Sequence, residues 1–159
     1  MVDKNTLTFS FSSEAPVKRY FGDEILDHEE SSVDLTRLNN NAAPLLFNHD
    51  PNIVLGKVSK AWIDGKRGMA TIKWATNTKA KEVRADVEAG ILESISVGYV
   101  VTEMEPDQEG DAMRATSWSP HELSIVSIPA DQSVGINRSL PFSFPTPKEH
   151  FTDMSYVTQ

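Results

Sequence analysis

The stretch that constrains the fold most is residues 77–101, which reads NTKAKEVRADVEAGILESISVGYVV. Its first half predicts a helix from Asn77 to Gly90, because Asn77 or Thr78 can cap the first turn and Gly90 suits the left-handed end of a helix. An apolar stripe follows the helical period at Ala80, Val83 and Val87. The second half, residues 91–101, is apolar and β-branched and predicts a strand directly after the helix.

The segments around this stretch predict further short elements. Residues 6–12 alternate apolar and polar side chains, the period of a half-buried strand. Residues 17–26 predict a weaker strand, whereas residues 27–41 are acidic and then Asn-rich and predict a loop with a helical turn. The dipeptide Asp64-Gly65 is typical of a tight turn and predicts a hairpin. Other apolar or alternating runs lie at 44–48, 53–63 and 68–75.

Many short strands and one central helix predict a mainly β chain of the α+β type. We expect a small antiparallel barrel or sandwich with helices packed outside it. Residues 112–128 contribute one or two strands, interrupted at Pro120. The periodicity ends after Ile128, and prolines become frequent further on. The sequence therefore predicts a domain over residues 1–139 and a Pro-rich tail or linker over residues 140–159.

The composition excludes several classes of protein. The 159 residues suit one domain, and the net charge of −8 with scattered Lys and Arg argues against a general nucleic-acid binder. The chain has no cysteine, which excludes disulfides, thiolate catalysis and Cys-based zinc sites. No apolar run reaches the roughly 20 residues of a membrane span, and the start has no apolar core of a secretory signal. We expect no cofactor, no metal, no nucleic acid and no membrane partner.

The four histidines are the first candidates for a general base. His28 lies in the acidic loop and His150 lies near the end, and we expect both to be solvated. His49 lies beside an apolar run, and His121 follows a proline in a predicted strand. Spacing alone favours histidines at the edge of the core with satisfied hydrogen bonds.

Hydroxyl and carboxyl groups occur on two predicted strands. Alternation places Ser94, Ser96 and Gly98 on one face, where a serine beside a small residue could be a nucleophile or part of a polar outward face. The surroundings do not match the Gly-x-Ser-x-Gly elbow of the α/β-hydrolases. On the later strand, alternation directs Glu122, rather than His121, to the polar face. A plain surface carboxylate is the alternative interpretation there.

Three segments taken together resemble the prohead proteases of tailed bacteriophages. The first is LFNHDP at residues 46–51, followed by LGKV at 55–58. The second is GILESISVGY at 90–99, and the third is ELSIVSIPAD at 122–131. They occur in the order of the family, and the resemblance covers roughly residues 5–138.

The resemblance implies a fold similar to that of the herpesvirus assemblin proteases, a small β-barrel wrapped by helices. It also implies a serine endopeptidase, with Ser96 as the nucleophile, His49 as the base and Glu122 as the residue that orients the base. The herpesvirus relatives use a histidine as the third member, so His121 stays an alternative to Glu122. Ser94 is the alternative nucleophile.

The resemblance further implies the partners and the place of action. The substrates would be a capsid scaffold protein or the scaffolding segment of the major capsid protein, and the enzyme's own polypeptide. The work would take place in the host cytoplasm, inside the immature capsid, and a homodimer is possible because herpesvirus relatives dimerise to become active. The alternative is a non-catalytic β-barrel that serves capsid assembly or scaffolding. The intact Ser96, His49 and Glu122 count against that alternative.

Overall fold

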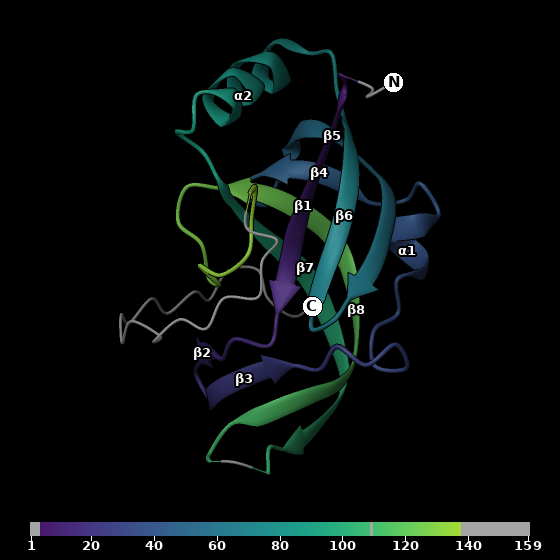
Figure 1. Cartoon of the computed structure of the whole chain (residues 1–159), viewed down its shortest axis with the longest axis vertical. Coiled ribbons are helices and arrows are strands. Elements are labelled where there is room, and N and C mark those ends of the chain that lie inside the picture. Colours follow the sequence, from purple (N-terminus) through teal and green to yellow (C-terminus); the bar gives the residue numbers. More distant parts are fainter. Residues whose placement is uncertain (1–3, 109, 138–159) are drawn as a thin grey trace.

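The computed structural model describes residues 4–108 and 110–137, which form one mixed eight-stranded sheet with two short helices (Figure 1). The strands are β1 (Thr6–Ser13), β2 (Val17–Arg19), β3 (Gly22–Leu26), β4 (Pro44–Phe47), β5 (Asp50–Asp64), β6 (Arg67–Trp74), β7 (Ser94–Pro106) and β8 (Met113–Val126). The helices are α1 (Thr36–Asn39) and α2 (Thr78–Glu88). The mainly β class is therefore confirmed.

The predicted antiparallel barrel is wrong in two respects. The strand order is β1-β6-β5-β4-β8-β3-β2, with β7 on the other edge of β8, and both β3 and β4 run parallel to β8. The sheet is also not closed. In the part of the chain that the structure describes, β1 and β7 are connected by single bridges from Gly135 to Ser10 and Ser94, instead of by a ladder of paired residues.

The helix predicted from residue 77 is confirmed as α2, and its two ends explain its position. The Asn77 side chain accepts a hydrogen bond from the Ala80 N–H at 2.9 Å, as a helix cap should. At the other end Gly90 has φ +75° and donates its N–H to Val87 at 3.1 Å. Only a residue without Cβ adopts this left-handed conformation without strain.

Most of the local strand predictions are confirmed. Residues 6–12 belong to β1, and β5 and β6 form a hairpin whose turn contains Gly65 at φ +59°. The weaker strand predicted over 17–26 is instead the short hairpin of β2 and β3. The helical turn expected within 27–41 is α1.

The predicted interruption at Pro120 is a bulge within one long strand. Gly98 pairs with Glu122 and Tyr99 pairs with Pro120, so His121 is an additional residue on β8. A bulge suits this place because proline has no N–H to donate to the neighbouring strand. Beyond the bulge β8 resumes the alternation that places Glu122 on one face and Leu123 on the other.

One hydrophobic core lies on the inner face of the coiled sheet. The helix α2 lies at one end of this sheet and packs against the core there (Figure 1). The largest fully buried side chains include Trp118, Phe9, Phe11, Leu45, Leu123 and Ile125. No helix within residues 4–108 and 110–137 is long and apolar enough to cross a membrane. His150 and the predicted tail over residues 140–159 lie outside the described residues.

The expectation that His28 is solvated is wrong. Its side chain is buried, with Nε2 2.8 Å from Ser12 Oγ and Nδ1 2.8 Å from the Leu26 carbonyl oxygen. The acidic sequence around His28 suggested exposure to solvent. The burial of this side chain could not be predicted from that sequence, because the strand that covers it comes from elsewhere in the chain.

Candidate active site

His49 lies in a two-residue turn between β4 and β5. The backbone of Asn48 has φ +50° and that of His49 has φ +59°, as in the tight turns that join paired strands. Such angles are uncommon for residues other than glycine, although Asn and His adopt them more often than most. A left-handed residue costs on the order of 1 kcal/mol and persists only where the surroundings hold it.

Hydrogen bonds to the end of β8 hold this turn. Asn48 donates its N–H to the Ile125 carbonyl at 2.9 Å, and its side-chain oxygen accepts the Ser127 N–H at 3.0 Å. His49 donates its own N–H to Ser124 Oγ at 3.0 Å. The position of the His49 backbone is therefore fixed relative to β8.

The His49 side chain contacts the carboxylate of Glu122. Nδ1 of the imidazole lies against Oε1, and Ser124 Oγ donates to the other oxygen, Oε2, at 3.1 Å. The two side chains are 8% and 18% exposed, so water screens the pair only partly. A carboxylate at Nδ1 favours the tautomer that carries its proton there, so Nε2 is the nitrogen that can exchange a proton with a substrate group.

Gly98 leaves the space that the Glu122 carboxylate occupies. It pairs with Glu122 across β7 and β8, and a Cβ on Gly98 would lie 3.0 Å from both Cγ and Cδ of that side chain. Oε1 would be closer still. The sequence predicted that Gly98 shares a face with Ser96, and in the structure the Glu122 side chain occupies the space beside this glycine.

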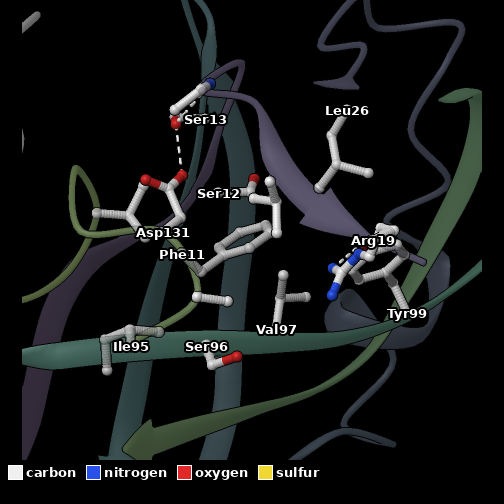
Figure 2. Close-up of a pocket in the computed structure, with 14 residues that line it drawn as sticks. Phe11, Ser12, Ser13, Arg19, Leu26, Ile95, Ser96, Val97, Tyr99 and Asp131 are labelled. Atoms are coloured by element: carbon white, nitrogen blue, oxygen red, sulfur yellow. Dashed lines mark hydrogen bonds between the residues drawn. The ribbon is translucent and has the colours of Figure 1, made fainter. Parts of the chain in front are cut away.

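Ser96 lies on the same face as Glu122, in the neighbouring row. It is paired with Ser124 across β7 and β8 and is 6% exposed. Side chains of directly paired residues leave the sheet on the same side, with Cβ atoms roughly 4.5–5.5 Å apart. Figure 2 shows the Ser96 side chain on the opposite side of β7 from Val97, which belongs to the core. Ser96 is thus beside Ser124, the residue bonded to both His49 and Glu122.

Two other predicted candidates lie elsewhere. Ser94 pairs with Val126, one row further from Glu122 than Ser96. His121 lies near Asp34 and Arg37; burial and the Arg37 charge lower its pKa, while Asp34 opposes them. The structure therefore places Glu122, and not His121, against His49.

The cavity in Figure 2 lies on the core side of β7 and has a volume of about 30 Å³. Phe11, Ser96 and Val97 line it together with the polar side chains of Arg19, Tyr99 and Asp131. Sites for small molecules usually measure roughly 300–1,000 Å³, so this cavity can hold water but no peptide.

Arg19, Tyr99 and Glu24 form a buried network beside this cavity. Arg19 donates to the Tyr99 hydroxyl at 2.7 Å, and that hydroxyl donates to Glu24. Burial, with a smaller contribution from Glu24, raises the pKa of Tyr99 above its ordinary value, so the phenol stays protonated. Its position on the inner face separates this network from His49 and indicates a structural role.

Comparison with known proteins shows the family of the chain. The family described as Caudovirus prohead serine protease matches residues 8–141. The chain belongs to this family. A major capsid protein of Halomonas phage phiHAP-1 is 42% identical to it over 137 residues, which are 82% of this chain and 23% of that relative. The chain thus spans less than a quarter of the length of this capsid protein. No solved structure matches the chain.

Sequence reasoning missed how the prohead protease domain supports its histidine. Asn48, Ser124 and Ser127 hold the turn and the carboxylate, yet none was proposed as part of the site. The dipeptide Asn48-His49 between two strand-forming runs was the available signal, since asparagine favours the first position of a two-residue hairpin turn. Within the described residues, no group of His, Asp and Glu could hold a metal ion.

Proposed function

We propose that this chain is a serine endopeptidase in which Ser96 is the nucleophile, His49 the general base and Glu122 the residue that orients the base. One observation supports this assignment most: the His49 imidazole is bonded through Nδ1 to Glu122 on the face of the sheet that also carries Ser96. A base fixed by a carboxylate and adjacent to a hydroxyl is the arrangement that acyl transfer requires.

In the proposed mechanism, His49 Nε2 takes the proton of the Ser96 hydroxyl while Ser96 Oγ attacks the carbonyl carbon of the scissile peptide bond. Glu122 stabilises the resulting imidazolium and keeps the ring in the productive tautomer. The imidazolium then gives its proton to the leaving amine, and an acyl-enzyme remains on Ser96. Water, activated by His49, hydrolyses this ester and regenerates the serine.

The match to a major capsid protein supports a capsid protein as the substrate. That relative is a major capsid protein of which the matching segment is 23%, so the domain is fused to capsid sequence in at least one phage. We propose that the substrates are the major capsid protein or its scaffold, and the chain itself, and that cleavage occurs inside the immature capsid in the host cytoplasm. Residues 1–139 would form the protease domain, with residues 140–159 as a linker or self-cleavage region.

The test is co-expression with the cognate capsid and scaffold proteins, with fragment masses measured on intact proteins. We compare the unaltered chain with Ser96→Ala and with the matched variant Ser94→Ala. Specific cleavage by the unaltered chain and by Ser94→Ala, but not by Ser96→Ala, is the expected result. Cleavage that survives in Ser96→Ala would remove that serine from the mechanism. Shells that form with no cleavage in any sample would favour the non-catalytic assembly module.

A further inference from the structure

We infer that Ser124 is a positioning residue for the proposed reaction, whose hydroxyl connects the base and the carboxylate that orients it. The inference rests on the proposed function. Ser124 is fully buried, and its Oγ accepts the His49 N–H at 3.0 Å while donating to Glu122 Oε2 at 3.1 Å. One side chain thus bonds to the backbone of one functional residue and to the side chain of another.

These bonds close a ring of three residues. The ring runs from the His49 N–H to Ser124 Oγ, on to Glu122 Oε2, and from Oε1 back to His49 Nδ1. The His49 residue is therefore held at both ends, at its amide and at its imidazole. Hydrogen bonds in such a ring polarise one another where little water is present. Loss of the Ser124 hydroxyl should therefore change the positions of both His49 and Glu122.

The position of Ser124 in the sheet adds a second argument. Ser124 is paired directly with Ser96 on β7, so the hydroxyl lies between the proposed nucleophile and the proposed base. A serine with only a structural role in the strand would not need its hydrogen bonds to His49 and Glu122.

Replacement of this hydroxyl should impair catalysis more than folding. In Ser124→Ala the turn keeps the Asn48 bonds to Ile125 and Ser127, so the sheet stays intact. The carboxylate and the imidazole lose a shared anchor, and small misplacements of reacting groups reduce rates by about 10- to 100-fold. We expect kcat to fall by that factor while KM changes by less than about twofold, because no substrate contact is removed.

Two readouts separate positioning from a structural role, namely the NMR signal of the His49 Nδ1 proton and rescue by a variant that keeps the hydroxyl. Ser124→Thr retains the hydroxyl and should restore most of the rate. Ser117→Ala is the matched control, because Ser117 is a half-buried serine of β8 that bonds to Thr102 and is remote from His49.

The experiment measures kcat and KM for cleavage of the cognate capsid protein by the four proteins, and records the His49 Nδ1 proton by NMR. A lower kcat in Ser124→Ala with a nearly unchanged KM, together with a shifted or lost Nδ1 proton signal and recovery in Ser124→Thr, supports the inference. An unchanged kcat, or an unchanged proton signal, overturns it. If the unaltered chain cleaves nothing, the proposed function fails, and the NMR comparison alone decides whether Ser124 positions His49.

Discussion

At the scale of single residues, Gly98 leaves the space that the Glu122 carboxylate occupies on the outer face of the sheet. In Gly98→Ala the added methyl would overlap the Glu122 side chain, which must then leave His49. The backbone of Gly98 is not left-handed, so the strand itself tolerates alanine. We expect kcat/KM to fall by about tenfold or more, with little loss of stability. Cleavage assays and urea unfolding measure the two effects separately.

Gly65 offers the opposite case and serves as the control. It lies in the β5–β6 turn with φ +59° and has open space around it, so Gly65→Ala strains the backbone without touching the site. This variant should lose about 1 kcal/mol of unfolding free energy and retain its kcat/KM. Full activity in Gly98→Ala would show that Glu122 does not need its present position.

His28 should make the stability of the protein depend on pH. Burial lowers its pKa from the ordinary value of 6.5, although the nearby Glu14 carboxylate opposes the shift. Below about pH 6.5 the unfolded chain therefore binds a proton that the folded chain does not. The free energy of unfolding should fall as the pH drops from 7 to 5, by at most about 1.4 kcal/mol per pH unit for this one group.

Urea unfolding at several pH values checks this dependence. We compare the unaltered chain with His28→Gln, which cannot titrate in this range. The variant should show a shallower loss of stability between pH 7 and pH 5, even if it is less stable at pH 7. Equal slopes in the two proteins would contradict a buried neutral His28.

The residues of the candidate site differ in how far the sequence could predict them. His49, Ser96 and Glu122 were proposed from a family resemblance and from strand alternation, which is a local property. The burial of His28 was not predictable in that way, because Ser12 approaches it from another strand. The same holds for Ser124, whose two bonds depend on how β4 docks beside β8.

At the scale of elements, the β4–β5 turn should be sensitive at Asn48. Asn48→Gly tolerates the left-handed backbone but loses the acceptor for the Ser127 N–H, so the turn should loosen and kcat should fall. Asn48→Ala loses the same bond and also strains the backbone, at a cost of about 1 kcal/mol relative to glycine. Urea unfolding should therefore rank Gly above Ala at this position. Equal stability of the two variants would argue against a strained turn.

Elements defined by local signals were predicted well, and their partners were not. The capped helix and the turn at Gly65 depend on a few adjacent residues, and both were found. The parallel pairing of β3 and β4 with β8 joins segments far apart in the chain, which no local pattern encodes. The sequence predicted an interruption at Pro120, because proline has no N–H to donate. It could not show that β8 pairs with β7 on both sides of this proline.

At the scale of the whole molecule, the segment after β8 joins the two ends of the open sheet. Gly135 bridges to β1 and to β7, and the Ile136 N–H donates to the Glu93 carbonyl at 2.9 Å. The side chains of Val134 and Ile136 are buried. Arg67 also donates to the Ser133 carbonyl, at 2.7 Å. This segment stabilises the coiled shape that a closed barrel would obtain from strand pairing.

Two shortened chains test where the folded unit ends. A chain of residues 1–139 retains all of these contacts and should unfold at the same urea concentration as the full chain. A chain of residues 1–131 loses the buried side chains of Val134 and Ile136, each worth roughly 1.5–3 kcal/mol, and should be less stable by about 3 kcal/mol or more. Both are measured in a Ser96→Ala background, so that self-cleavage cannot alter the length. Equal stability of the two shortened chains would mean that the open sheet holds its shape without this segment, and that the domain ends with β8.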